Sequence, residues 1–163
     1  MGVSKKEYIP NMVVYRIVKS KERTRDLSGQ GAFIEGGRWN NPGIFLLYAS
    51  MNSSLAILES LVHFDESELP PRMFIMHIEI DETEAIHQYP DKDLPKNWRQ
   101  PENLELKKIG DKLIRGNHYL AIKVRSAVNP DEYNMLLNPL YPKYYDLVKL
   151  IAAEPYTLDQ RLL

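Results

Sequence analysis

Two predicted strands are separated by the run Gly36-Gly37-Arg38-Trp39-Asn40-Asn41-Pro42-Gly43. Before it, residues 12–18 are mostly β-branched or aromatic and surround Arg16, which predicts a first strand. After it, residues 44–49 are almost wholly apolar, which predicts a central strand that is covered on both faces. A glycine-rich loop that carries an arginine therefore leads into the middle of a sheet.

A helix is predicted over residues 52–64, directly after the second strand. Polar residues at positions 50, 52 and 53 offer N-caps for it. An apolar stripe at helical spacing is formed by Leu55, Leu58, Leu61 and Val62. Glu59 lies at the edge of this stripe, so we expect its side chain to face inward more than a solvated glutamate does.

The rest of the chain mixes strands and helices. Strands are predicted over 72–80 and 119–124, a helix over 102–115, and a strand or short helix over 144–151. Residues 19–41 and 81–101 are polar and lack a period, so we expect long connections there. No repeat or linker divides these pieces, which favours one domain over residues 1–163, of the α+β class, with a mixed β-sheet core and flanking helices.

Composition excludes several classes of protein. The apolar share of 44% and the charged share of 26% are ordinary for a globular protein, and the absence of cysteine excludes disulfides and thiolate metal sites. A net charge of −1 gives no global field toward nucleic acid or an anionic membrane. Neither a signal peptide nor an apolar run long enough to span a membrane is apparent, so we expect a cytoplasmic protein.

Familiar catalytic motifs are also missing. The four histidines are spread apart without metal-ligand spacing, so no metal site is predicted. The Gly-x-Ser-x-Gly elbow of serine hydrolases is absent, as are the phosphate-loop lysine signature and a dinucleotide-binding Gly-x-Gly-x-x-Gly after a strand.

Four residues remain as a candidate site: Arg16, Arg38, Tyr48 and Glu59. An arginine on a glycine loop can present a planar fork to a phosphate, and a tyrosine at a strand end offers a flat ring for a base. A helix carboxylate can stabilise an oxocarbenium-like transition state. The set suits scission of an N-glycosidic bond in a dinucleotide, although a buried ion pair of Arg16 with Glu59 and a core role for Tyr48 fit the sequence equally well.

A basic stretch, Lys19, Lys21, Arg23 and Arg25, lies ahead of the glycine loop. It is either a solvated loop or a rim beside Arg38 that attracts phosphate.

Several motifs together resemble the RES domain, a family named after an arginine, a glutamate and a serine. They are Asp26-Leu27-Ser28-Gly29-x-Gly31-Ala32, Gly36-Gly37-Arg38-Trp39-Asn40, Leu47-Tyr48-Ala49-Ser50, Leu55-Ala56-x-Leu58-Glu59-x-Leu61-Val62-His63, Ser126, Asn134-x-x-Leu137-Asn138-Pro139 and Asp159-x-Arg161-Leu162.

The resemblance implies a toxin of a bacterial toxin–antitoxin pair, with an ADP-ribosyltransferase-like fold and NAD as substrate, with no separate cofactor. By position, Arg16 and Arg38 would hold phosphates and ribose, Tyr48 would pack on the nicotinamide side, Glu59 would be the catalytic carboxylate, and Ser126 would complete the pocket. NAD would be cleaved at the nicotinamide–ribose bond by water or phosphate, or its ADP-ribose would be transferred to a protein.

The resemblance also implies a partner, an Xre-like antitoxin with a helix-turn-helix domain that blocks the cleft. A homo-oligomer is compatible with the sequence, whereas direct contact with nucleic acid or a membrane is not expected. Two other functions fit the residues less well. They are a catalytically silent nucleotide-binding module and RNA binding through the basic stretch, which the near-neutral net charge disfavours.

Overall fold

The computed structural model describes residues 11–63, 67, 72–81 and 85–162. These residues form a seven-stranded sheet in the order β4-β5-β6-β2-β1-β3-β7. The strands are β1 Met12–Val18, β2 Leu47–Ser50, β3 Met73–Ile80, β4 Ile86–Gln88, β5 Ala121–Arg125, β6 Tyr133–Leu137 and β7 Val148–Tyr156. Neighbouring strands are antiparallel except β4 and β5, which are parallel, so the predicted mixed sheet is confirmed.

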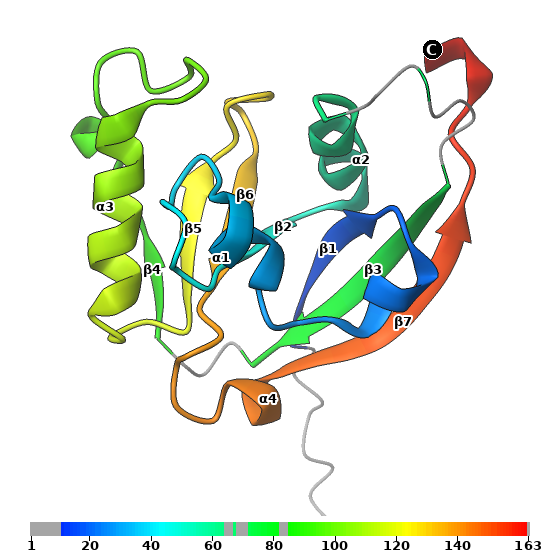
Figure 1. Cartoon of the computed structure of the whole chain (residues 1–163), viewed down its shortest axis with the longest axis horizontal. Helices are drawn as coiled ribbons and strands as arrows, with labels where there is room; N and C mark the ends of the chain where they lie inside the picture. The colour runs from blue at the N-terminus through cyan, green and yellow to red at the C-terminus, as the bar shows by residue number, and fades with distance from the viewer. Residues whose placement is uncertain (1–10, 64–66, 68–71, 82–84, 163) are drawn as a thin grey trace, which may run out of the picture.

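Within the described residues, four α-helices flank the sheet (Figure 1): α1 Gln30–Glu35, α2 Ser53–Leu61, α3 Leu104–Arg115 and α4 Tyr144–Leu147. Short 3₁₀ helices cover Lys21–Arg25 (η1), Asp91–Asp93 (η3) and Gln160–Leu162 (η4). In α2 and α3 the side chains of Asn52 and Asn103 accept backbone N–H groups of the first turn. The α+β class with flanking helices is therefore confirmed, and each longer helix begins at a polar cap.

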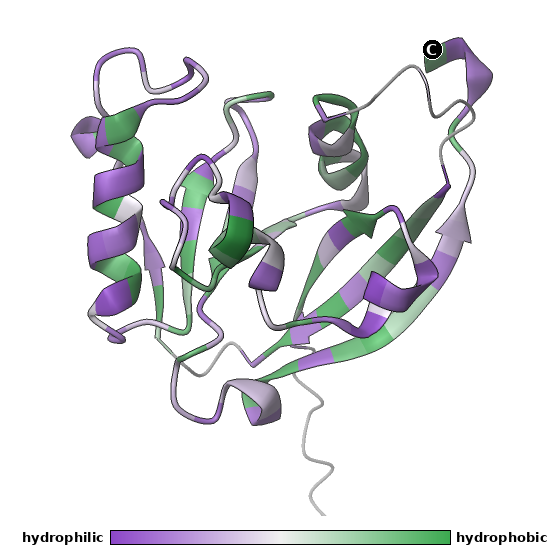
Figure 2. Ribbon diagram, viewed as in Figure 1, coloured by the Kyte–Doolittle hydropathy of each residue, from purple (hydrophilic) through white to green (hydrophobic). Residues whose placement is uncertain are grey.

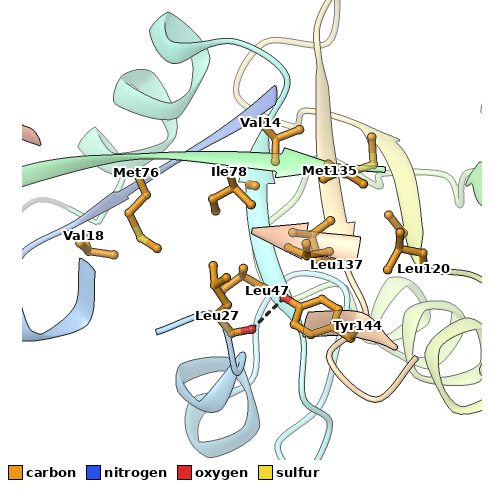
Figure 3. Packing of buried hydrophobic residues seen from close by; sticks show 14 residues of the cluster. Val14, Val18, Leu27, Leu47, Met76, Ile78, Leu120, Met135, Leu137 and Tyr144 are labelled. Atoms are coloured by element: carbon orange, nitrogen blue, oxygen red, sulfur yellow. Dashed lines mark hydrogen bonds between the residues drawn. The ribbon is translucent and has the colours of Figure 1, made fainter. Parts of the chain in front are cut away.

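The sheet is covered on both faces at β2 and β6, two neighbouring strands near its centre. On one face, alternate residues such as Leu47 and Leu137 pack with Leu27 and Tyr144, and the Tyr144 hydroxyl donates to the Leu27 carbonyl at 2.8 Å (Figure 3). On the other face, Leu136 belongs to a second cluster with residues of α3. Because a strand alternates its side chains, this double coverage explains the apolar run that predicted a central strand.

The sheet divides between β1 and β2. The antiparallel register pairs only Tyr15 with Ser50, whereas β2 and β6 pair along their whole length. In Figure 1, β3 and β7 cross the view diagonally while β5 and β6 stand upright. The two halves of the sheet therefore separate along residues 47–49, where β2 pairs with β6 but not with β1.

Several expectations about local structure are wrong. The predicted connection 19–41 contains η1 and α1, and the connection 81–101 contains β4, because elements of three to six residues are too short to show a period. The apolar stripe of α2 is only partly buried: Leu55 is covered, but Val62 is 63% exposed. Leu104, the first residue of α3, is 67% exposed. Figure 2 shows hydrophobic and hydrophilic residues interleaved along both α2 and α3.

Candidate active site

The glycine loop that carries Arg38 is fixed by two charged residues of α3. Lys107 Nζ donates to the Gly37 carbonyl. Asp111 Oδ1 accepts the Asn41 backbone N–H at 2.9 Å, and Oδ2 accepts the Asn41 side-chain amide at 2.7 Å. Lys107 and Asp111 are both buried, and their separation of four residues places them on one side of the helix. Because a buried charge is stable only when paired, this loop and helix position each other.

Tyr48 holds the same loop from the sheet. Its hydroxyl accepts the Trp39 backbone N–H at 2.9 Å and donates to Asn40 Oδ1 at 2.7 Å. Gly37 lies against the ring, since a Cβ there would come within 2.6 Å of the Tyr48 hydroxyl oxygen. Burial raises the pKa of Tyr48, so the phenol stays neutral. The Tyr48 hydroxyl is therefore occupied by the loop that presents Arg38.

Arg38 extends from this loop toward residues 98–100. Its Nη1 donates to the main-chain carbonyls of Trp98 and Gln100, both at 3.1 Å. None of the ion pairs formed within the described ranges involves Arg38. A half-buried guanidinium that is oriented by carbonyls but not neutralised can still attract an anion.

Glu59 is held by two donors on one carboxylate oxygen. Oε1 accepts the Ser126 hydroxyl at 2.6 Å and the Asn134 side-chain amide at 2.7 Å. Ser126 Oγ itself accepts the backbone N–H groups of residues 128 and 129, so its own proton is directed to Glu59. Asn134 Oδ1 accepts the Ser50 hydroxyl at 2.8 Å, which fixes the amide from the other end.

The second oxygen of Glu59, Oε2, is available to a ligand. Among the described residues Oε2 accepts no hydrogen bond, and none of their buried side-chain oxygens lacks a partner. Oε2 therefore reaches solvent. A carboxylate with one oxygen fixed and one open is oriented to act on a group outside the protein.

Arg16 lies where β1 and β2 separate. By strand alternation it shares a face with Val14 and Val18, and its Nη1 donates to the Tyr48 carbonyl at 2.8 Å. Burial and, to a smaller extent, the nearby Arg23 lower the pKa of Arg16 to about 10, with Asp26 acting in the opposite direction. The guanidinium thus satisfies a main-chain carbonyl of β2 at the point where that carbonyl loses its strand partner.

The predicted site residues are brought together in part. Glu59 and Ser126 form a direct hydrogen bond, and Arg16 reaches the main chain of Tyr48. Arg38 contacts neither Arg16 nor Glu59 through any hydrogen bond or ion pair of the described residues. The interpretation of Arg16 and Glu59 as a buried ion pair is wrong, because each is bound to other partners.

The basic stretch is placed differently from the expectation of a rim beside Arg38. Arg23 lies next to Arg16, on a small pocket at the opening between β1 and β2. Arg25, two residues further along η1, does not line that pocket. Arg23 and Arg25 of the basic stretch therefore lie in different surroundings, and only Arg23 lines this pocket.

Sequence reasoning missed the residues that support the site. They are Ser50, Lys107, Gly110, Asp111 and Asn134. A signal existed for α3, since charged or glycine residues interrupt its apolar positions at helical spacing, as they do when a helix faces a polar loop. Asn134 belongs to one of the motifs that resemble the RES domain, but the motif alone did not indicate what its side chain contacts. No three metal-ligating side chains come together in the part of the chain that the structure describes, and none of its helices is long and apolar enough to cross a membrane.

Comparison with known proteins agrees with this fold. The model of the RES domain matches residues 13–159. A protein from Yersinia enterocolitica named Toxin Res is 32% identical over 152 residues, covering 93% of this chain and 99% of its own. A protein from Sphingobium named Prs ADP-ribosylating toxin is 35% identical over 120 residues, covering 72% of this chain and 74% of its own.

Among solved structures, the Mycobacterium tuberculosis MbcT-MbcA toxin-antitoxin complex contains a chain that superposes with a TM-score of 0.69 at 17% identity, covering 90% of this chain and 85% of that one. At that identity the likeness concerns the fold. The match of the RES model to most of the sequence goes further, and this chain belongs to the RES domain family.

Proposed function

We propose that this chain is the toxin of a toxin–antitoxin system and that it cleaves NAD at the bond between nicotinamide and ribose. The observation that carries the proposal is the state of Glu59: Ser126 and Asn134 fix one oxygen, and the other reaches solvent. The relatives named Toxin Res, matched over nearly their whole length, support the toxin role.

The chemistry follows from the charge that the reaction creates. When the carbon–nitrogen bond breaks, its electron pair leaves with the pyridinium nitrogen, so nicotinamide departs neutral and the ribose becomes an oxocarbenium-like cation. An oriented carboxylate stabilises that cation, and Glu59 Oε2 is the group available for it. Water or phosphate then forms the new bond to the ribose and loses a proton to solvent.

Arg16 and Arg38 would bind the anionic and hydroxyl groups of the dinucleotide. Arg38 on the glycine loop has no ion-pair partner among the described residues, and the ring of Tyr48 packs under that loop. We assign Tyr48 to positioning Arg38 as well as to the nicotinamide side of the pocket, because its hydroxyl is occupied. Ser126 would act through Glu59, by orienting the carboxylate.

The experiment is incubation of the purified chain with NAD, with free nicotinamide measured by chromatography. We expect nicotinamide release, and we expect Glu59→Gln to reduce it by about a hundredfold or more, because the amide keeps an oxygen for Ser126 but loses the charge. The control is Glu105→Gln, at an exposed position in the first turn of α3. Binding of NAD without its consumption, with water, phosphate and protein acceptors present, would reject the proposal in favour of a silent binding module.

Transfer of ADP-ribose to a protein is the second candidate, because one relative is named Prs ADP-ribosylating toxin. The same incubation separates the reactions by product: free ADP-ribose for hydrolysis, ADP-ribose 1-phosphate for phosphorolysis and a modified protein for transfer.

We also propose an antitoxin partner with a helix-turn-helix domain, supported by the toxin-antitoxin complex that contains the similar fold. Inhibition of nicotinamide release by the product of an adjacent gene would test it.

A further inference from the structure

Two guanidinium groups face one pocket at the opening between β1 and β2. Arg16 and Leu47 line it from the strands, and Arg23 lines it from η1, with Asp26 and residues 29–31 completing the wall. The enclosed space is about 10 Å³, enough for about one water molecule, and it opens to solvent, so a larger ligand binds at its mouth. Arg16 is the residue that the family resemblance points to, whereas no motif singles out Arg23.

Glycine at position 31 makes room for the Arg23 side chain. A Cβ on Gly31 would come within 3.0 Å of Arg23 Nη2, so the guanidinium lies directly over that glycine. Arg23 is otherwise exposed, and it takes part in none of the ion pairs of the described residues. Arg23 thus places a solvated positive charge, without a direct ion pair, at the wall of the pocket.

The pocket carries an excess of positive charge. Asp26 is its carboxylate, and one Asp26 oxygen already accepts the backbone N–H and the hydroxyl of Ser28, at 2.9 and 2.5 Å. Arg16 uses one N–H for the Tyr48 carbonyl. Since buried side-chain nitrogens among the described residues all have partners, the other nitrogens of Arg16 reach solvent. Two cations against one carboxylate leave a formal charge of about +1, which favours an anion.

We infer that this pocket binds a phosphoryl group and that Arg23 is its second cationic residue. A phosphoryl group has several acceptor oxygens and can accept hydrogen bonds from both guanidinium groups. A carboxylate ligand has only two oxygens and would satisfy fewer of the N–H donors. The identity of the ligand rests on the proposed function: it is either a phosphate of the dinucleotide or the inorganic phosphate that attacks the ribose.

The pocket is connected to Glu59 by the strand pairing. Arg16 follows Tyr15, which pairs with Ser50, and Ser50 reaches Glu59 through Asn134. Arg16 and Tyr15 are adjacent in β1 and point to opposite faces of the sheet, so a ligand that contacts both the pocket and Glu59 must pass through the opening between β1 and β2.

The test compares Arg23→Gln with Arg25→Gln, its matched control. Both arginines are exposed residues of η1, and both variants remove one positive charge, but Arg25 does not line this pocket. Binding of ADP-ribose and of inorganic phosphate is measured separately by calorimetry, without turnover. We expect Arg23→Gln to weaken at least one of these ligands by about tenfold or more, and Arg25→Gln to weaken it less than about twofold.

The two ligands distinguish the source of the phosphoryl group. If Arg23→Gln weakens the binding of ADP-ribose alone, the pocket holds a phosphate of the dinucleotide. If it weakens the binding of inorganic phosphate alone, the pocket holds the phosphate that attacks the ribose. Equal effects of the two substitutions, or no binding of either ligand to the unsubstituted protein, would overturn the inference. Because binding is measured without NAD cleavage, failure of the proposed reaction would appear separately, as absence of nicotinamide release.

Discussion

Gly110 of α3 lies against the main-chain carbonyl of Trp39 so closely that a Cβ would come within 1.7 Å of the Trp39 oxygen. The glycine is therefore required for contact between the helix and the loop that carries Arg38, although glycine disfavours a helix interior. We expect Gly110→Ala to lower the free energy of unfolding by about 1 to 3 kcal/mol in urea denaturation, because the helix must move off the loop.

Gly116→Ala is the control for this change. A Cβ at position 116 would meet first the exposed ring of His118, at 3.0 Å, which can turn away. If Gly110→Ala were as stable as this control, the close contact would not limit the sequence of α3.

Asp111 anchors the same loop through both of its oxygens. Asparagine at this position keeps one acceptor for the Asn41 backbone but places an amide donor against the Asn41 side-chain donor. We expect Asp111→Asn to cost about 1 to 3 kcal/mol of stability and to slow nicotinamide release, because Arg38 loses its support. Asp93→Asn, at an exposed site in η3, should change neither quantity. If Asp111→Asn lowered the stability but left nicotinamide release unchanged, the anchoring of the loop by Asp111 would not be required for activity.

The elements with a clear period could be predicted from the sequence. β1 was predicted with its observed bounds, and α2 and α3 were placed within a few residues because their apolar residues recur at helical spacing. β4 and α1 could not be found this way. β4 has three residues and is held by its parallel neighbour β5, so its structure depends on a contact distant in sequence.

The candidate site shows the same limit. The inward direction of Glu59 followed from the helical stripe, but its partners could not be predicted, because Ser126 follows β5 and Asn134 lies in β6, and only the sheet order brings these strands near α2. Charged side chains at Lys107 and Asp111 would ordinarily be placed on a solvated face. They are buried because the glycine loop offers them a carbonyl and two N–H donors, which no local pattern reveals.

Ser126 and Asn134 donate to the same oxygen of Glu59, so their contributions should not add. We expect Ser126→Ala and Asn134→Ala each to reduce nicotinamide release, since either change lets the carboxylate rotate. In the double variant the loss should be smaller than the product of the single losses, because residues that act as a unit are non-additive. A double-mutant cycle on turnover measures this coupling. Strictly multiplicative losses would mean that the two donors act independently.

Tyr48 makes the free energy of unfolding depend on pH in the alkaline range. Burial raises its pKa above the ordinary value of 10, so the neutral phenol favours the folded state. This contribution is complete below pH 10 and is lost as the pH rises from 10 toward the pKa in the folded protein, with a slope of up to about 1.4 kcal/mol per pH unit. Tyr48→Phe, which cannot ionise, should lose less stability than the unsubstituted protein when urea denaturation is repeated between pH 9 and about 11.

Tyr145→Phe is the matched control, because Tyr145 is 61% exposed. Arg16 acts in the opposite direction, since its lowered pKa favours the folded state progressively above pH 10, and Tyr144 acts in the same direction as Tyr48. Arg16 and Tyr144 are present in all three proteins, but Tyr145 contributes to the raised pKa of Tyr144, so the contribution of Tyr48 is identified by a slope that is lower in Tyr48→Phe than in both other proteins. Identical slopes for the two variants would show that the Tyr48 hydroxyl titrates as it does in water, and that the loop carrying Arg38 does not depend on a neutral phenol.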